Sequence, residues 1–389
     1  MPGPDYWLTK KVLLLVTSIA LTLGATEVFL RLSPWPLGGF YVLVPGTSWS
    51  ITAAPEVING VTGVAHYRVN RRGIRGRDFG PDHSEYRILA IGGSTTECAQ
   101  LDETEVWTSL MEAALARSSG ERRPWVGNIG RSGLTSREHV VQLKYLLDQY
   151  PHFDALVALV GVNDMLGALR RGWDYRLPTP ITQPAAEQED LARAFAVVPP
   201  GEPRGESWVR RTALWHLARQ VKLSWNARRT FDLTKGAQGL IHAREHRLQG
   251  RVIDTLPPLD APLSDYRYNL TAMAALARAA RTRLVLVTAP SLWRANLSPR
   301  EAEKLWFGWI GSDWPSSASY FSSGALASAM ARYNTTMLDV CRDQGIECVD
   351  AASVLPRDTL TFYDDIHFTE AGSRALASLL TSYFRSRAP

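Results

Sequence analysis

The sequence has few cysteines and only one long apolar run. The first shortage excludes a disulfide-rich scaffold, and the second argues against a multi-span membrane protein. Three cysteines among 389 residues cannot staple a disulfide-rich scaffold. Hydrophobic residues at 45% and charged residues at 21% are ordinary for a globular protein, and neither a coiled coil nor a multi-span membrane protein fits that composition. The length predicts two or three domains, since a domain commonly has about 150 residues. Composition alone points to no activity.

The apolar run lies near the amino end. Residues 12–32 read VLLLVTSIALTLGATEVFLRL, which would make a helix about 31 Å long, close to the hydrocarbon thickness of a bilayer. Lys10 and Lys11 precede the run, and basic residues beside a span are usually retained in the cytoplasm. We therefore expect residues 1–33 to be a single transmembrane anchor, with the rest of the chain periplasmic or otherwise extracytoplasmic.

Two alternatives to an anchor stay open, a cleaved signal peptide and a buried helix of a soluble domain. Glu27 and Arg31 lie in the last turns of the run and leave only residues 12–26 free of charge. No convincing small-x-small cleavage site follows, however, and Glu27 and Arg31 have the i, i+4 spacing of an ion pair. These two observations favour the anchor.

Short apolar runs alternate with helical patterns in two parts of the chain. The expected strands are residues 86–91, 125–128, 155–160, 284–288 and 346–349, and the expected helices are residues 104–116, 136–147 and 369–384. Buried strands that alternate with helices form a parallel sheet covered on both faces. We predict an α/β fold with three layers, α/β/α, around a five-stranded parallel sheet of the flavodoxin-like type.

One segment precedes this pattern and another interrupts it. Residues 34–80 are rich in Pro, Gly and short β-like stretches, among them YVLV at 41–44, and are expected to wrap the following domain. Residues 166–262 lack the α/β alternation and are expected to be a helical insertion. The α/β domain is therefore expected to be discontinuous, made of residues 81–165 and 263–389.

Basic residues are concentrated within the insertion. Residues 204–251 contain 11 Lys or Arg and 3 Asp or Glu, although the whole chain has a formal charge of only +5. Apolar residues at helical spacing predict an amphipathic basic helix, with Trp208, Leu214, Trp215, Ala218, Val221 and Trp225 approximately on one face. Three interpretations stay open: the aromatic residues pack onto the main domain, the helix contacts anionic lipid or an acidic polymer, or it binds nucleic acid. We expect no nucleic-acid partner, because an extracytoplasmic protein rarely meets one.

Ser94 follows the first expected strand and two glycines, in IGGSTTE, at the start of a helix. Glycines let the backbone turn sharply, and a helix amino terminus presents free N–H groups and partial positive charge to a developing anion. Taken alone, such a serine is more simply a helix cap. The motif is not a P-loop, because no Gly-Lys-Ser/Thr follows, nor a G-x-S-x-G elbow, because Thr96 replaces the second glycine.

Further clusters stand at the carboxyl ends of other expected strands, where the loops of a doubly wound sheet converge. After the fifth strand, FYDDIHFTEAG places Asp364 three residues before His367. A carboxylate there would accept the Nδ1 proton of the imidazole and leave Nε2 free to act as a base. The second strand is followed by Asn128, Gly130 and Gly133 in GNIGRSG, and the third by Gly161, Asn163 and Asp164 in GVND.

These blocks resemble the SGNH hydrolase superfamily, also called the GDSL family, over residues 80–165 and 280–389. The family's four blocks are present in order, with Ser94 in the first, Gly130 in the second, Asn163 in the third, and Asp364 with His367 in the last. The lead-in YRVNRRGIRGRD and the TAP after the fourth strand are similar to membrane-tethered bacterial members. One departure is that Gly92-Gly93-Ser94 stands where the family has Gly-Asp-Ser, which keeps the nucleophile but removes a supporting polar contact.

The resemblance implies a serine esterase that uses no metal and no cofactor. Ser94 would attack a carbonyl carbon, with His367 as general base and Asp364 orienting the imidazole. The N–H groups of Ser94 and Gly130 and the side-chain amide of Asn163 would hold the oxyanion. Asp365 is the rival carboxylate, but its spacing to His367 is two residues rather than three.

The expected location and the habits of the family together favour an O-acylated surface or cell-wall glycan as the substrate. An O-acyltransferase with the same residues, a lipid esterase, and a non-catalytic glycan-binding or assembly protein are the alternatives. The sequence predicts neither the acyl group nor the oligomeric state.

The three cysteines and a second group of tryptophans also stand at defined places in the expected fold. Cys341 and Cys348 flank Gly345 between a helix and a strand and are placed to form a disulfide in an oxidising compartment, whereas Cys98 is expected to pack beneath the site rather than to react. A second aromatic group follows the fourth strand and either packs in the core or faces a ligand: Trp293, Trp306, Trp309 and Trp314.

Overall fold

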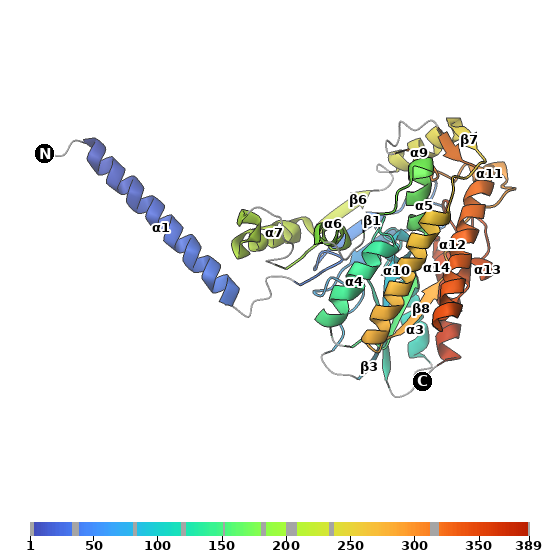
Figure 1. Cartoon of the computed structure of the whole chain (residues 1–389), viewed down its shortest axis with the longest axis horizontal. Coiled ribbons are helices and arrows are strands. Elements are labelled where there is room, and N and C mark those ends of the chain that lie inside the picture. Colours follow the sequence, from blue (N-terminus) through green and yellow to red (C-terminus); the bar gives the residue numbers. More distant parts are fainter. Residues whose placement is uncertain are drawn as a thin grey trace.

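A five-stranded parallel sheet forms the centre of the protein in the computed structural model (Figure 1). Its strand order is β4-β3-β5-β8-β10, and every neighbouring pair is parallel. The strands are β3 (Glu85–Gly92), β4 (Arg123–Asn128), β5 (Ala155–Leu159), β8 (Arg283–Val287) and β10 (Glu347–Val349). The structure describes residues 4–32, 39–80, 84–117, 122–150, 152–179, 184–199, 208–232, 237–311 and 319–387. The predicted α/β fold, its five strands and its flavodoxin-like order are confirmed.

Helices cover both faces of this sheet, as expected for strands that are buried on both sides. On one face α3 (Trp107–Ala116) packs against α14 (Glu370–Arg385), and on the other α10 (Asp260–Ala279) packs against both α4 (Ser136–Gln149) and α12 (Ser323–Gln344). The central strand β5 reads ALVAL and all five residues are buried. The remaining short helices of this domain are α2 (Ser94–Glu97), α11 (Pro299–Ala302) and α13 (Ala351–Val354).

A second, smaller sheet joins the segment that precedes the α/β domain to the insertion. Its order is β2-β1-β6, in which β1 (Ser48–Thr52) pairs antiparallel with β2 (Val64–Arg68) and parallel with β6 (Arg228–Asp232) from the insertion. The predicted β-like stretch at 41–44 is wrong, because Tyr41 makes only an isolated bridge to Val197 and the next residues form bends. Val42 and Leu43 are nevertheless buried, so the hydrophobicity of this stretch reflects packing rather than strand pairing.

The insertion is mainly helical, as predicted. Its elements are α5 (Val162–Arg171), η1 (Gly172–Asp174), α6 (Pro184–Ala194), η2 (Trp208–Arg211), α7 (Ala213–Asn226), β6, α9 (Gln238–Gln249) and β7 (Arg251–Ile253), which pairs with β9 (Ser319–Phe321). The predicted basic amphipathic helix corresponds to η2 and α7. The interpretation that its tryptophans pack onto the main domain is wrong, because Trp208, Trp215 and Trp225 are all exposed.

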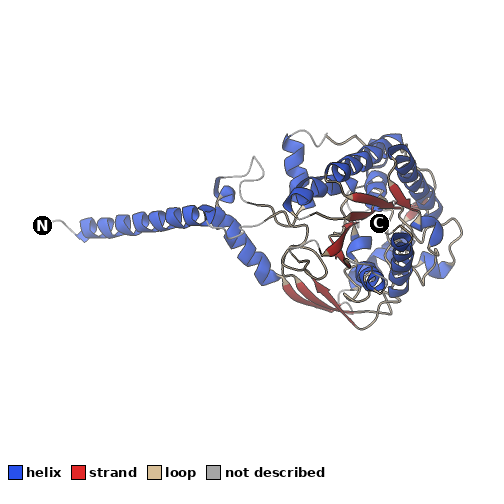
Figure 2. Cartoon of the chain, turned by 90° about the horizontal axis from the view of Figure 1, so that it is seen from below, coloured by secondary structure: helices blue, strands red, loops and turns tan. Residues whose placement is uncertain are grey.

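Helix α1 (Pro4–Leu32) extends away from the body (Figures 1 and 2). Within the part of the chain that the structure describes, it is the one helix long and apolar enough to cross a membrane, over Thr9–Leu32, and a signal sequence has the same character. The expected ion pair is present, with Arg31 Nε donating to Glu27 Oε1 at 2.7 Å.

The disulfide that the sequence left open is present, and Cys98 is buried as expected. Cys341 at the end of α12 and Cys348 in β10 form a disulfide across the turn at Gly345, which has φ +61°. Cys98 is buried, and burial raises the pKa of its thiol to about 12. Such a thiol stays protonated at neutral pH, so a packing role fits Cys98 better than a reactive one.

Candidate active site

Ser94 stands at the carboxyl end of β3, where the chain turns sharply into α2. Glycine is required at Gly92, because a Cβ there would lie 2.5 Å from the Leu159 carbonyl oxygen. This tight turn leaves Ser94 half-buried, with its hydroxyl available to groups from other loops.

His367 reaches Ser94 from the loop before α14. Its Nε2 is 2.7 Å from Ser94 Oγ, and its Nδ1 is 2.7 Å from Asp364 Oδ2. The loop is closed by a backbone bond from the Tyr363 N–H to the His367 carbonyl at 3.0 Å, and the Tyr363 ring stacks on the imidazole at 5.5 Å. The hydroxyl, the imidazole and the carboxylate therefore form one continuous hydrogen-bonded row.

Asp364 is held in its orientation by several donors. Its Oδ1 accepts the N–H groups of Ile366 at 2.9 Å and His367 at 2.8 Å, and its Oδ2 also accepts Trp306 Nε1 at 3.0 Å. Burial acts to raise the pKa of Asp364, but the neighbouring imidazole and these hydrogen bonds outweigh burial and lower the pKa below its ordinary value. The carboxylate is thus ionised and rigid.

The same pairing acts on the imidazole in the opposite direction. Burial disfavours the charged form of His367, but the negative charge of Asp364 and the hydrogen bond from Nδ1 outweigh burial and raise the pKa of His367 above its ordinary value. His367 is therefore a stronger base than a solvent-exposed histidine.

Asp365 has a different set of partners from its neighbour. Its Oδ1 accepts Trp293 Nε1 at 2.7 Å, and its Oδ2 accepts the backbone N–H groups of Trp306 at 2.7 Å and Phe307 at 3.2 Å. Asp365 therefore binds the loops after β8 and α11, while Asp364 contacts the imidazole.

Asn163 lies beside Ser94 from the first turn of α5. The turn that precedes it uses Gly161 at φ +109°, and one amide hydrogen of Asn163 is donated to the Leu134 carbonyl at 2.8 Å. Asn163 Nδ2 also lies against Gly93, since a Cβ at that position would be 2.3 Å from it.

Gly130 differs from the expectation at its N–H group. A Cβ there would lie 2.2 Å from the Glu97 backbone nitrogen, so glycine lets the loop after β4 pack directly on α2. The Gly130 N–H, however, donates to Asn128 Oδ1 at 2.8 Å. This is a local side-chain bond of the kind that asparagine forms two residues along a turn, so an oxyanion at Gly130 would share this N–H with Asn128 or displace its side chain.

Gly133 is the third glycine of GNIGRSG, and the sequence predicts no separate role for it. It has φ +80°, which a glycine adopts readily. The next residue, Leu134, accepts the Asn163 amide through its carbonyl, so the loop after β4 contacts the first turn of α5.

Asp164 fastens the two loops that carry these donors. Its carboxylate accepts the N–H and hydroxyl of Ser136 at the start of α4, and Asn269 Nδ2 donates to the same hydroxyl at 3.1 Å. Burial raises the pKa of Asp164 to about 7. The interaction links the first turn of α5, which bears Asn163, to the first turn of α4, which follows Gly133 and Leu134.

The second aromatic group is divided between core and site. Trp293 is fully buried beneath Asp365, whereas Trp306 is half-buried and Phe307 lies 5.9 Å from the His367 ring. Trp309 is buried with its face under Arg170 at 4.2 Å. Trp314 lies outside the described residues.

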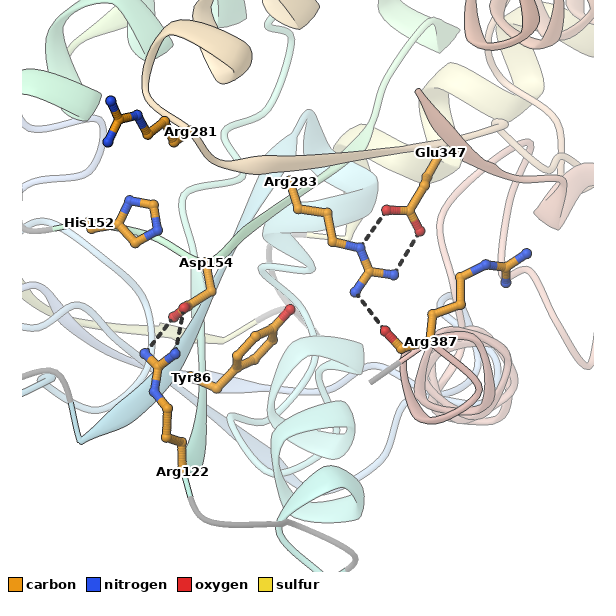
Figure 3. A pocket seen from close by; sticks show the side chains of 8 residues that line it. All are labelled: Tyr86, Arg122, His152, Asp154, Arg281, Arg283, Glu347 and Arg387. Atoms are coloured by element: carbon orange, nitrogen blue, oxygen red, sulfur yellow. Dashed lines mark hydrogen bonds and ion pairs between the residues drawn. The ribbon is translucent and has the colours of Figure 1, made fainter. Parts of the chain in front are cut away.

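A pocket at the opposite end of the sheet has a different chemistry (Figure 3). Charged side chains from the amino ends of the strands line it, but they bind one another in two pairs: Arg122 donates to Asp154 at 2.6 and 2.9 Å, and Arg283 donates to Glu347 at 2.5 and 2.7 Å. None of the residues proposed for catalysis lines this pocket.

Comparison with known proteins identifies a family for this chain. The model of the GDSL-like lipase/acylhydrolase family matches residues 90–375. No curated protein matches the sequence. Similar solved structures include Axe2, an acetylxylan esterase from Geobacillus stearothermophilus (14% identity, 78% of this chain and 94% of that chain, TM-score 0.40). Others are TesA (14%, 77% and 98%, TM-score 0.39) and a lipase/acylhydrolase from Enterococcus faecalis (14%, 77% and 96%, TM-score 0.38).

The family of the chain is shown by the family model. It covers well over half of the sequence, from the last residues of β3 into α14. The chain therefore belongs to the GDSL-like lipase/acylhydrolase family and is an ester hydrolase of the SGNH type.

Proposed function

We propose that the protein is a serine esterase in which Ser94, His367 and Asp364 form the catalytic triad. The observation that carries the proposal is the unbroken row from Ser94 Oγ through His367 to Asp364, with 2.7 Å at each contact. A nucleophile, a base and a group that orients the base, each within hydrogen-bonding reach of the next, are the parts that acyl transfer needs.

The reaction proceeds in two halves. His367 Nε2 takes the Ser94 hydroxyl proton as Oγ attacks the ester carbonyl, and the tetrahedral intermediate collapses when the imidazolium returns that proton to the leaving alcohol. Water then attacks the acyl-serine by the same route, so the acid is released and the serine is restored. Throughout, Asp364 holds Nδ1–H and stabilises the imidazolium.

The oxyanion is held by the N–H groups of Ser94 and Gly130 and the second amide hydrogen of Asn163. Two observations support this set: Gly130 packs directly on α2, the helix that Ser94 begins, and Asn163 uses one amide hydrogen on the Leu134 carbonyl and keeps the other. Each such donor is typically worth about 10² to 10³ in rate.

The esterase acts outside the cytoplasm and stays anchored by α1. Glu27 supports retention of the helix, because its carboxylate accepts the N–H groups of Ala213 at 2.9 Å and Leu214 at 3.0 Å, and removal of α1 would leave the start of α7 without this cap. Lys10 and Lys11 at the other end of α1 favour a cytoplasmic amino terminus.

An O-acylated glycan is the proposed substrate. The half-buried Trp306 and Phe307 present aromatic surface beside His367, and aromatic side chains with a few placed polar groups are the usual lining of a ligand site. An O-acyltransferase would use the same acyl-serine and replace water by a sugar hydroxyl.

Labelling of the detergent-solubilised full chain with a fluorophosphonate tests the site. Mass spectrometry is expected to find the adduct on Ser94, and Ser94→Ala is expected to abolish labelling. Labelling elsewhere, or none in the folded wild-type protein, would remove the triad assignment. Product analysis with an acetylated oligosaccharide, with and without an acceptor sugar, separates hydrolysis from transfer.

A further inference from the structure

The segment that joins the apolar helix to the body has an unusual surface. We call residues 208–226, comprising η2 and α7, the junction helix. Its amino end is fixed to α1, because Glu27 accepts the first two N–H groups of α7, at Ala213 and Leu214, while Arg31 binds the same carboxylate. A carboxylate at a helix amino terminus is a favourable cap. The junction helix therefore begins at the last turns of the candidate span.

The other end of the junction helix is fixed to the body. α7 leads directly into β6, which pairs in parallel with β1, and the Ser48 N–H donates to the Ala227 carbonyl at 2.8 Å. Figures 1 and 2 show α7 between the carboxyl end of α1 and this small sheet. The junction helix therefore connects α1 to the body and helps to set the orientation of the body relative to α1.

The outward side of the junction helix is apolar and aromatic. Trp208 is 79% exposed and Trp225 is 84% exposed, and Trp215 and Val221 are also exposed. Trp215, Ala218, Lys222 and Trp225 follow the i, i+3, i+4 spacing of one helix face. On the inward side Ala213 and His216 are buried. Large aromatic residues gathered on one exposed face indicate a surface that is covered in use.

Charge and position identify what covers it. Arg219 and Lys222 are exposed on the same helix as Trp215 and Trp225, and Arg228 follows directly. Tryptophan with basic residues is the composition of helices that lie in the headgroup layer, where the rings sit at the boundary and the cations meet anionic lipid. The surface also begins beside Glu27, in the last two turns of a helix suited to span the bilayer.

We propose that the junction helix lies in the anionic headgroup layer of the membrane that α1 crosses, and so holds the body at one fixed orientation to that membrane. The proposal rests on α1 being a retained span, and it does not depend on the catalytic residues. α1 and β6 hold the two ends of the junction helix. Insertion of its outward face into the headgroup layer therefore fixes the orientation of the whole esterase domain relative to the membrane.

Spin-label accessibility in the full chain tests this placement. Cys98 is buried and the other two cysteines are bonded, so one introduced cysteine provides the reactive thiol. Trp225→Cys is compared with Leu360→Cys, a matched control on the body that is 74% exposed. Each is nitroxide-labelled and reconstituted in phosphatidylcholine nanodiscs with and without phosphatidylglycerol.

The label at position 225 is expected to collide more with oxygen than with a water-soluble nickel chelate in anionic discs, and the label at 360 to do the reverse. Equal nickel access at the two positions in anionic discs would overturn the proposal. Strong dipolar broadening between labels at 225 would overturn it in favour of a second copy of the chain. Neither result bears on fluorophosphonate labelling of Ser94, so failure here is distinguishable from failure of the esterase assignment.

The role of charge is tested in the same system. Arg219→Glu with Lys222→Glu is expected to restore nickel access to the label at 225 in anionic discs by several-fold, because anionic lipid repels the reversed charges. The control pair Arg300→Glu with Arg357→Glu, exposed positions on the body, is expected to leave the accessibility unchanged. Equal effects of the two pairs would overturn the assignment of anionic lipid.

Discussion

The two ends of the central sheet carry similar charged residues and use them in opposite ways. At the amino ends of the strands, Arg122 and Arg283 each bind a carboxylate through two nitrogens, so Asp154 and Glu347 have their charge satisfied within the protein. At the carboxyl ends, Asp364 binds Nδ1 of His367, and Nε2 of the same imidazole is hydrogen-bonded to the Ser94 hydroxyl.

This difference separates a structural charge pair from a reactive one. At the amino ends the two pairs are closed, because each guanidinium and its carboxylate satisfy one another (Figure 3). The row at the carboxyl ends finishes at a half-buried hydroxyl, whose proton can be taken when an ester is bound. The changes below, ordered by expected effect, are designed to break or sharpen this comparison.

Removal of the nucleophile or the base is expected to have the largest effect. Ser94→Ala and His367→Ala should each lower kcat by about 10⁴ to 10⁶, because members of a triad act as a unit. The double variant should be little worse than either single variant. Initial rates with a p-nitrophenyl ester and a thermal unfolding scan measure this, and additive losses in the double variant would show that the two residues act separately.

The neighbouring carboxylates should respond differently. Asp364→Asn is expected to lower kcat by about 10⁴, since an amide cannot stabilise the imidazolium in the same way. Asp365→Asn should chiefly lower the melting temperature, because Asp365 holds Trp293 and the backbone at Trp306 and Phe307. Parallel kcat and melting measurements on both variants check this, and the reverse pattern would exchange their roles.

Loss of the oxyanion amide should cost less than loss of a triad member. Asn163→Ala is expected to lower kcat by about 10² to 10³ with KM nearly unchanged, because the donor matters most in the transition state. Steady-state kinetics measure the two constants separately. As a control, Asn128→Ala frees the Gly130 N–H that Asn128 now occupies, and a loss as large as that of Asn163→Ala would implicate the Asn128–Gly130 turn directly.

The pH dependence should reveal the pairing of His367 with Asp364. The pKa of His367 is raised by that carboxylate, and only the neutral imidazole can accept the serine proton. We therefore expect kcat/KM to fall on acidification with an apparent pKa above the ordinary histidine value of about 6.5. Asp364→Asn should move that apparent pKa downward in its residual activity, and an unchanged profile would contradict the electrostatic link.

The reach of sequence reasoning differs between these regions. The strands follow from runs such as ALVAL, because burial on both faces demands continuous hydrophobicity. Ser94, Asn163, Asp364 and His367 stand at strand ends, and the resemblance to SGNH hydrolases implies their roles. The bond from the Gly130 N–H to Asn128 Oδ1 could not be predicted, because it depends on the local geometry of the turn. The exposure of Trp225 was equally hidden, since an amphipathic pattern shows that one face differs without showing what it meets.

The smallest effect is expected at the amino ends of the strands. Arg283 and Glu347 are partly exposed, so their mutual coupling in a double-mutant cycle with Arg283→Ala and Glu347→Ala should be about 1 kcal/mol of unfolding free energy. Arg283 also donates to the Arg387 carbonyl at 3.4 Å, and Glu347 also accepts the Tyr383 hydroxyl at 2.9 Å, so each single variant should cost more than the coupling alone. Neither variant should change kcat, because neither side chain lies at the end of the sheet that bears Ser94. Chemical denaturation and ester hydrolysis measured on the same four proteins decide this, and a tenfold fall in kcat with stability intact would mean that the amino ends of the sheet are coupled to catalysis.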